Sequence, residues 1–440
     1  MKTATGPLPS ITDSSPRAHS ADAGQPFALP EAIASNGSRL HGKRVAMIMF
    51  SFYPSDPRPR RAADALLKEG ASVDLICLRD ENAPSREVLN GINVRRIAIE
   101  HRRGGKLAYA WQYFAFIVAC AVILSRRTLT HRYDLVYVHN MPDILVFSGL
   151  VPKIMGARVV LDQHDPMPEL MSAIFGVGGD SFYVQILKRL EKLSFNCADL
   201  VLTVNRACER IFTTRSCRPG KVGVVMNAPD GRLFPLHAPS ATRPGRSPQD
   251  SFVIMYHGSL VERNGLDLAV QALVPVLKTC PAAELRIYGK ATPFLNHVLA
   301  QAASLGLGES VRYLGTKRLE DLAGEIEKCD VGIIPNQRNA FTDINTPTRI
   351  FEYLALGKPV IAPSTPGILD YFSEDSLLLF ETGDAADLAR QLEYVAHNYE
   401  NAVEVAERGQ QIYLQHTWQQ ERTTLVNLVG ALFRGKEART

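Results

Sequence analysis

Short apolar runs alternate with longer amphipathic segments along most of the chain. In the first half the runs cover residues 43–50, 71–78, 92–99, 133–140, 157–164 and 199–205. Apolar strands that alternate with helices are typical of a parallel sheet with helices on both faces. The pattern therefore predicts a Rossmann-like, doubly wound α/β domain over residues 43–225.

A proline-rich segment divides this region from a second one of the same pattern. Residues 226–250 contain five prolines and are predicted to be an interdomain linker. Strands and helices then alternate again, which predicts a second Rossmann-like domain over residues 251–405. Residues 406–440 have a helical pattern with a break near His416, and we expect the last helix to pack back on the first domain. Residues 1–42, rich in Pro, Ser, Ala and Gly without an apolar run, are expected to form a disordered tail.

The segment Leu107–Leu124 is apolar, carries no charge and lies between basic flanks. Three interpretations stay open. The segment is a helix buried on the sheet, or a monotopic helix that contacts an anionic membrane surface through its tyrosines and tryptophan. The third is a membrane span, which would put the neighbouring strands on opposite sides of the membrane.

Composition excludes several classes of function. The hydrophobic content of 46% and charged content of 21% are those of a globular protein, and the net charge of +4 does not indicate a nucleic-acid partner. Seven cysteines without a CxxC argue against a zinc site and a disulfide framework, and for a reducing, cytoplasmic compartment. The first strand is not followed by GxGxxG, which argues against an NAD-dependent enzyme.

Polar residues follow several predicted strands, and in a parallel sheet such strand ends form the ligand site. In the first domain the candidate residues are Tyr53, Arg58, Arg61, His139, Asn140, His164 and Asp165. Singly, each has the alternative explanation of an ordinary loop or cap residue. Together on one sheet edge, they favour a binding cleft.

In the second domain the stretch NTPTRIFEYLALGKPVIA, residues 345–362, carries the strongest candidate site. Thr346 is predicted to cap a helix that begins at Pro347. Arg349 beside the free N–H groups of the helix start suits a phosphate, and Glu352, one turn further on, suits a ribose hydroxyl. An ordinary helix–strand unit with an exposed Arg–Glu pair is the other explanation.

A second loop of this domain offers the backbone and the charge that a diphosphate needs. Gly258 and Ser259 end the first predicted strand, and glycine lets a backbone approach a ligand closely. Arg263 follows in the loop, so Arg263 and Arg349 would be two cations able to hold a diphosphate if both loops face one cleft. A solvent-exposed surface arginine is the alternative for Arg263.

Six segments taken together resemble the GT-B glycosyltransferases, specifically the large retaining, nucleotide-sugar-dependent family (family 4-like). They are FYPSDPRPRR, VYVHNMPDILVF, LDQHDPMPEL, NAPDGRLF, YHGSLVERNGLDLAVQAL and TPTRIFEYLALGKPVIA, in the family's order. The chain departs from the family at Ser259 and Asn264, where an arginine and a lysine are frequent. It also departs at Ile344, where the first of two glutamates usually lies.

The resemblance implies two domains facing a cleft and transfer of a sugar from a nucleoside-diphosphate sugar with retention of configuration. It implies that Arg349 binds donor phosphate, that Glu352 binds the ribose and that His164 contacts the sugar. We expect the site residues to divide into three roles. His164, Arg263 and Arg349 are catalytic; Gly258, Ser259, Arg263, Thr346, Thr348, Arg349 and Glu352 bind the donor; Tyr53, Arg58, Arg61, His139, Asn140 and Asp165 lie on the acceptor side.

No DxD pair stands at a strand end, so we expect neither a metal nor another cofactor. The expected partners are a nucleotide-sugar and a glycan or lipid-linked acceptor, with a peripheral contact of residues 107–124 to the inner face of a membrane. The expected role is cell-surface polysaccharide synthesis. Two other functions stay open: a sugar-nucleotide epimerase, which needs no acceptor, and a non-catalytic nucleotide-sugar-binding protein.

Overall fold

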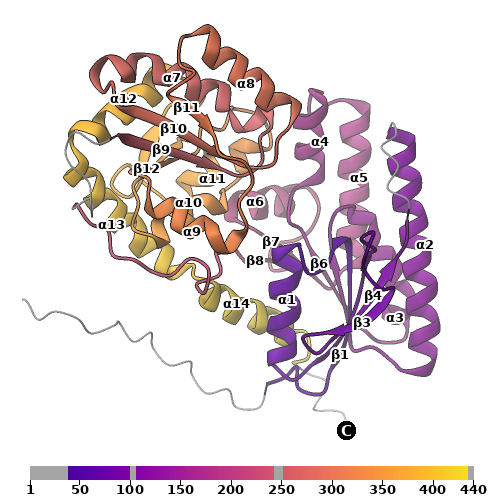
Figure 1. The fold of residues 1–440 in the computed structure, drawn as a ribbon. Helices are drawn as coiled ribbons and strands as arrows, with labels where there is room; N and C mark the ends of the chain where they lie inside the picture. Colours follow the sequence, from indigo (N-terminus) through magenta and orange to yellow (C-terminus); the bar gives the residue numbers. More distant parts are fainter. Residues whose placement is uncertain (1–37, 100–105, 242–250, 435–440) are drawn as a thin grey trace, which may run out of the picture. The chain divides into compact units, whose positions relative to one another are not determined.

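The computed structural model describes residues 38–99, 106–241 and 251–434, with side chains of the long helix α2 from residue 110. Within these ranges the chain forms two parallel-sheet α/β domains, as the alternating pattern predicted (Figure 1). The predicted tail falls outside the described residues up to residue 37. The predicted boundary of the tail at residue 42 is wrong, because Leu40 is fully buried in the core of the first domain.

The first domain is built on an eight-stranded sheet with the order β3-β4-β2-β1-β5-β6-β7-β8, in which only the β3–β4 pair is antiparallel. The strands are β1 Arg44–Phe52, β2 Ser72–Leu78, β3 Arg86–Leu89, β4 Ile92–Ile97, β5 Leu135–His139, β6 Arg158–Asp162, β7 Leu200–Thr203 and β8 Val222–Val224. The helices are α1 Pro57–Lys68, α2 Lys106–Thr130, α3 Leu150–Ile154, α4 Met167–Phe175, α5 Phe182–Cys197 and α6 Arg206–Arg215, with a 3-10 helix η1 at Asp143–Gly149.

Alternation along the central strand β1 produces two cores, one on each face of the sheet. Val45 and Met47 pack with α1, whereas Ala46 and Ile48 pack with α2. Successive side chains of a strand point to opposite faces, so a continuous apolar run fits a strand that is covered on both sides. Figure 1 shows α1 and α2 on opposite sides of this sheet.

The second domain has a six-stranded parallel sheet with the order β11-β10-β9-β12-β13-β14. The strands are β9 Phe252–His257, β10 Ala283–Tyr288, β11 Val311–Tyr313, β12 Val331–Ile333, β13 Val360–Pro363 and β14 Leu378–Phe380. The helices are η2 Glu262–Asn264, α7 Leu266–Thr279, α8 Pro293–Ser304, α9 Leu319–Glu327, η3 Thr342–Ile344, α10 Thr348–Ala355, α11 Pro366–Leu369 and α12 Ala385–His397. Because β9 lies inside the sheet, its carboxyl end is flanked by loops from both sides.

The C-terminal region divides between the two domains at the predicted break. Helix α13, Tyr399–Gln415, packs on α10 of the second domain. Helix α14, Trp418–Ala431, begins after a Thr417 cap and packs on α1 of the first domain. The prediction that the last helix returns to the first domain is therefore confirmed. The predicted linker is described up to residue 241, and its Phe234 is buried in a core of the second domain.

Helix α2 is longer than the apolar segment that predicted it, and it is buried on one face only. Phe116, Cys120 and Leu124 are fully buried against the sheet, while Trp111 and Phe114 are 68% and 57% exposed. By length and composition the segment Ala110–Thr130 of this helix could cross a membrane, and 22% of its apolar stretch is buried inside the protein. The strands before and after it, β4 and β5, belong to one sheet, so α2 is a crossover of that sheet and the spanning interpretation is wrong for this fold.

Candidate functional site

Asp162, at the carboxyl end of β6, is the centre of a buried polar network in the first domain. Its Oδ1 accepts hydrogen bonds from Nε and Nη2 of Arg58 at 3.0 and 2.6 Å, and its Oδ2 accepts one from the Tyr137 hydroxyl at 2.9 Å. Burial opposes ionisation of Asp162, but the Arg58 guanidinium and a hydrogen bond from His139 hold its pKa well below the usual range. The network therefore contains an ionised pair inside the protein.

Arg58 and Arg61 need correction as acceptor-side residues, because both are buried and engaged within the chain. Besides Asp162, Arg58 donates to the carbonyl of Val225 at 2.9 Å and to Asn227 Oδ1 at 3.0 Å. Arg61 donates to the carbonyl of Ala228. The two guanidinium groups thus hold α1 to the segment that leaves the first domain.

Tyr53 also lies in the interior. It is 4% exposed, and its hydroxyl has no hydrogen-bond partner among the described residues. Burial raises the pKa of Tyr53 to about 12, so the hydroxyl is neutral and can donate. Tyr53 follows β1 as predicted, but its side chain is buried and does not face an open acceptor side.

His139, Asn140, His164 and Asp165 do come together at the ends of β5 and β6. His139 Nδ1 lies 2.9 Å from His164 Nε2. Asn140 accepts the backbone N–H of His164 at 2.8 Å and donates to the carbonyl of Asp165 at 2.8 Å. Asn140 therefore fixes the loop that carries the other two residues.

The electrostatics of this loop favour neutral side chains. Desolvation holds the pKa of His164 well below its usual value, against the attraction of Asp162. Burial raises the pKa of Asp165 to about 6, although the positive charges of Arg263 and Arg58 lower it. His164 is thus neutral at pH 7 and is suited to hydrogen bonding. Asp165 titrates near the physiological range.

His139, Asp162 and His164 have ligand-type atoms within 4.8 Å of one another, the arrangement of a metal site. The contacts fit a metal poorly. Both oxygens of Asp162 already accept hydrogen bonds, and the guanidinium of Arg58 lies 2.6 Å from one of them. A divalent cation would have to displace or repel that charge.

In the second domain the predicted phosphate helix is α10, and its start is shifted by one residue. The helix begins at Thr348, with Pro347 at the N-cap, so the prediction that Thr346 caps it is wrong. The Thr346 hydroxyl instead donates to the carbonyl of Gly367 at 2.7 Å and accepts from Asn205 at 3.2 Å. Thr346 therefore ties together three loops, and the N–H groups of the first turn of α10 have no side-chain cap.

Arg349 lies at the carboxyl end of β9. Its Nη1 donates to the carbonyl of His257 at 2.8 Å, and its guanidinium lies over the Tyr256 ring at 4.6 Å. Gly258 has φ +129°, and a Cβ there would lie 2.8 Å from Nη1 of Arg349. A side chain at position 258 would push the guanidinium away, and the positive φ is one that residues with a side chain rarely adopt. Both the space and the backbone conformation therefore favour glycine.

Glu352 is one turn further along α10, with 13% of its side chain exposed and Oε2 3.4 Å from His257 Nε2. Burial lowers the pKa of His257 to about 3, so the imidazole is neutral and this contact is not an ion pair. Burial raises the pKa of Glu352 to about 7, although Arg349 and Arg61 lower it. The carboxyl therefore lacks a strong partner in the protein, which suits a ligand hydroxyl.

We expect Glu352→Gln to stabilise the protein more at pH 8 than at pH 5. Folding raises the pKa of Glu352 from 4.5 to about 7, so wild-type stability falls as the pH rises through that window. The amide avoids this loss, with an expected gain of about 1–3 kcal/mol at pH 8. Urea unfolding at both pH values measures it, with the exposed Glu381→Gln as the control. An equal gain at the two pH values would contradict the buried-carboxyl explanation.

The loop after β9 carries the other predicted donor residues. The carbonyl of Ser259 accepts from the Tyr256 hydroxyl at 2.7 Å and from Asn264 Nδ2 at 2.8 Å. Asn264, where the family often has a lysine, thus holds the loop in shape. The guanidinium of Arg263 lies over the Phe341 ring at 5.8 Å. Its charge also acts on Asp165 of the first domain, but no contact joins Arg263 to Arg349 in the described residues.

Ile344, at the position of the family's first glutamate, has a structural role in this chain. Its side chain packs against a core of the first domain, and its carbonyl accepts from Asn205 at 2.8 Å. The neighbouring Asp343 has one carboxyl oxygen without a hydrogen-bond partner in the described part of the chain. Position 344 therefore serves the contact between domains, and Asp343 is the nearest acid to the missing glutamate.

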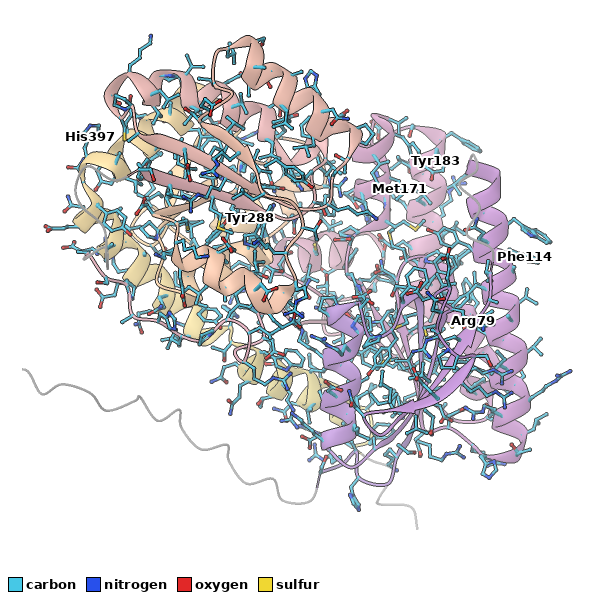
Figure 2. The ribbon with its side chains drawn as sticks, in the orientation of Figure 1. Arg79, Phe114, Met171, Tyr183, Tyr288 and His397 are labelled. Carbon is cyan, nitrogen blue, oxygen red and sulfur yellow. The ribbon has the colours of Figure 1, made fainter. Side chains whose placement is uncertain are left out.

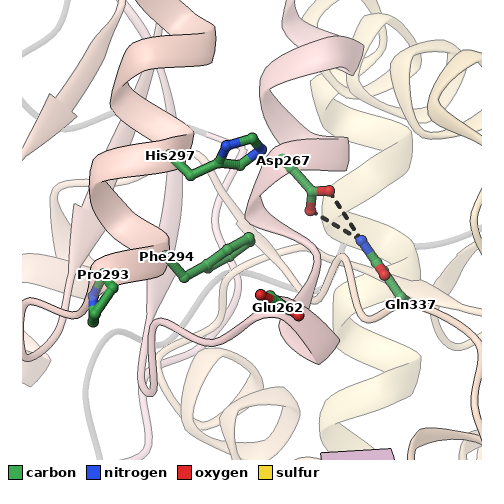
Figure 3. Close-up of a pocket in the computed structure, with 6 residues that line it drawn as sticks. All are labelled: Glu262, Asp267, Pro293, Phe294, His297 and Gln337. Atoms are coloured by element: carbon green, nitrogen blue, oxygen red, sulfur yellow. Dashed lines mark hydrogen bonds between the residues drawn. The ribbon is translucent and has the colours of Figure 1, made fainter. Parts of the chain in front are cut away.

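A cavity of about 440 Å³ opens near the starts of α7 and α8. It is lined by Glu262, Asp267, Pro293, Phe294, His297 and Gln337 (Figure 3). The carboxylate of Asp267 accepts from Gln337 Nε2 at 3.0 Å through both oxygens. None of these residues was predicted from the sequence.

Tyr137 and Asp162 of the first domain were not predicted as site residues either, because a polar residue inside an apolar strand carries no local signal of its partners.

Known families match both domains. A model described as "Glycosyl transferase 4-like domain" matches residues 56–228, and one described as "Glycosyl transferases group 1" matches residues 251–398. D-inositol 3-phosphate glycosyltransferase of Streptosporangium roseum is 25% identical over 365 residues, which are 76% of this chain and 78% of that protein. The probable glycosyltransferase WbjE of Pseudomonas aeruginosa is 24% identical over 63% of this chain and 66% of its own length.

Solved structures share the fold. Sucrose-phosphate synthase of Thermosynechococcus elongatus superposes with a TM-score of 0.71 at 18% identity, over 90% of this chain and all of that one. HepE of Anabaena in complex with UDP superposes with a TM-score of 0.65 at 17% identity, over 88% of this chain and all of that one. The two family models match most of both domains, although β1 lies before the first match, and the segments that suggested the resemblance lie within or beside the matches. The chain therefore belongs to the glycosyltransferases of the GT-B fold.

Proposed function

We propose that this enzyme transfers a sugar from a nucleoside-diphosphate sugar to an acceptor hydroxyl with retention of configuration. The observation that carries the proposal is that Arg349 and Glu352 lie one helical turn apart at the carboxyl end of β9. A fixed cation lies there beside uncapped N–H groups, and a carboxyl without a strong partner lies one turn away. This is the arrangement that a diphosphate and a ribose need. HepE, which shares the fold, has been solved with UDP and with UDP-glucose.

In the proposed reaction the bond between the anomeric carbon and the diphosphate oxygen breaks, and negative charge develops on the leaving diphosphate. Arg349 and the N–H groups of α10 stabilise that charge, with Arg263 as a second cation and no metal. The acceptor hydroxyl attacks the face that the diphosphate leaves, and its proton goes to a phosphate oxygen. His164 binds the sugar. Asp165 is the only first-domain carboxyl in this loop that remains to be tested as a nucleophile, because Asp162 is paired with Arg58.

A donor panel tests the proposal. The protein is incubated with UDP-, GDP-, TDP- and ADP-sugars, and release of the nucleoside diphosphate is followed with and without a membrane extract as acceptor source. Slow hydrolysis of one donor, accelerated by the extract, is the expected result. Conversion of the donor to an isomeric nucleotide-sugar without the extract would support the epimerase. No release from any donor would support the binding protein.

The exposed face of α2 supports a lipid-linked acceptor. Trp111, Phe114, Val118, Val122 and Leu129 are exposed along this helix, and Phe114 lies on its outer side (Figure 2). The described part of α2 contains no acid, and Arg126 near its end is exposed. We propose that this face contacts the anionic inner surface of a membrane. The putative colanic acid biosynthesis glycosyltransferase WcaL of Escherichia coli is 24% identical over 200 residues. This likeness supports a part in cell-surface polysaccharide synthesis.

We expect the wild-type protein to float with phosphatidylglycerol-containing liposomes and the double variant Trp111→Ser/Phe114→Ser to bind at least about a hundredfold more weakly. Each large apolar side chain contributes about 1.5–3 kcal/mol when it leaves water. Val88→Ser is the matched control, because Val88 is 69% exposed on the edge strand β3. Wild-type protein that stays at the bottom of the gradient would refute the membrane contact.

A further inference from the structure

A chain of contacts leads from the interior of the first domain to His164. Arg58 binds Oδ1 of Asp162, and Oδ2 of Asp162 lies 3.4 Å from His139 Nδ1. The same Nδ1 lies 2.9 Å from His164 Nε2. His139 is 1% exposed, and its Nε2 has no hydrogen-bond partner within the described ranges. His139 therefore acts on its surroundings through Nδ1 alone.

The position of the proton on His139 follows from these neighbours. An ionised carboxylate near Nδ1 favours the tautomer with the proton on that nitrogen. With Nδ1 of His139 as a donor, Nε2 of His164 has to be the acceptor. A neutral imidazole has one donor and one acceptor nitrogen, so His164 carries its own proton on Nδ1. A free histidine side chain prefers the opposite form, with the proton on Nε2.

We propose that His139 is a positioning residue that holds His164 in the Nδ1–H tautomer, so that the partly buried His164 presents a hydrogen-bond donor to an oxygen of the bound sugar. The inference rests on the proposed function for the identity of that oxygen. Protonation of His164 would add a proton on Nε2, directly facing the N–H of His139, so the pair resists acting as a base. The fixing of a tautomer by a neighbouring group resembles the way in which carboxylates and carbonyls hold the tautomer of functional histidines elsewhere.

A neighbouring metal would give the same two rings a different state, and the observations disfavour it. A metal bound by both histidines would require unprotonated nitrogens at Nδ1 of His139 and Nε2 of His164. It would also require an oxygen of Asp162 that Arg58 and Tyr137 do not already occupy. The tautomer and the metal-bound state differ in their nitrogen spectra, so one measurement separates them.

The test is the nitrogen chemical shifts of His164 in the full-length protein labelled with ¹⁵N-histidine, assigned by comparison with His164→Gln. In the wild type we expect a protonated Nδ1 and an unprotonated Nε2. In His139→Phe, which keeps an aromatic ring but lacks the donor, we expect the proton to move to Nε2. In His139→Asn, whose side-chain amide can donate from the same place, we expect the wild-type pattern.

Three results would overturn the proposal. One is an Nε2–H form in the wild type, and another is an unchanged tautomer in His139→Phe. The third is a joint shift of both histidines on addition of zinc that reverses with a chelator. The wild-type spectrum alone decides the first point, even if the Phe variant fails to fold. Because the spectra are recorded without donor, a failure of glycosyl transfer in the donor panel leaves this result intact, and the two proposals fail separately.

Discussion

Arg349→Ala is expected to lower kcat/KM for donor turnover by about 10²–10³-fold, the cost of removing one preorganised group that stabilises charge in a transition state. The guanidinium is held over the Tyr256 ring and bonded to the carbonyl of His257, so it needs no rearrangement to meet the leaving diphosphate. Nucleotide affinity should fall as well, because a diphosphate is charged before and after the bond breaks.

The measurement combines calorimetry with UDP and GDP and a continuous assay of nucleoside diphosphate release. Arg338→Ala is the matched control, since Arg338 is a half-exposed arginine in the same domain that pairs with Glu381 on the surface. Both variants should remain folded under the assay conditions, which urea unfolding checks. Equal activity and affinity in Arg349→Ala and wild type would refute the donor site at α10.

Asp162→Ala is expected to destabilise the first domain by about 3–5 kcal/mol, because it leaves the charge of Arg58 buried without its partner. Glu381→Ala, which breaks the exposed pair with Arg338, should cost under about 1 kcal/mol. Urea unfolding at pH 7 measures both. A loss in Asp162→Ala as small as in the control would mean that Arg58 reaches water.

The pH dependence of this effect has a defined sign. Folding lowers the pKa of Asp162, so its contribution is present above the unfolded value near 4 and is lost as the pH falls below it. The difference between wild type and Asp162→Asn should therefore be constant from pH 6 to 8 and shrink in acid. A difference that grows in acid would contradict the ionised pair.

Much of the fold could be predicted because burial on both faces leaves a continuous apolar run in each central strand. The runs at β1, β5 and β9 are long and follow loops with clear breakers. The edge strand β3 and the three-residue strand β8 were not predicted. Their side chains alternate between exposed and partly buried positions or are too few to show a period. Tertiary pairing, not local pattern, defines such strands.

The candidate site could be predicted where function depends on residues close in sequence. Arg349 and Glu352 share one helix, and their spacing alone puts them on neighbouring turns. Arg58 could not be assigned in this way, because its role depends on Asp162, more than a hundred residues away. A polar residue at a strand end has the same local sequence whether it faces a ligand or a buried partner.

Ile344 shows why a departure from a family motif is hard to interpret from sequence. An apolar residue in place of a glutamate suggests only a lost contact. In the structure the residue packs against the first domain, and its carbonyl receives a hydrogen bond from Asn205. This contact between the two domains depends on residues far apart in the sequence, so the motif alone does not reveal it.

Helix α14 gives the order of synthesis a role in folding. The core that covers one face of the first sheet contains Leu425, Val429 and Phe433, and Glu421 accepts the backbone N–H of Met226 at 2.7 Å. The ribosome makes these residues only after the whole second domain. Until they are made, α1 covers this face of the first sheet only in part, and exposed apolar surface of this kind makes nascent chains prone to aggregation. A helix made after the second domain thus completes the core of the domain that precedes it in the chain.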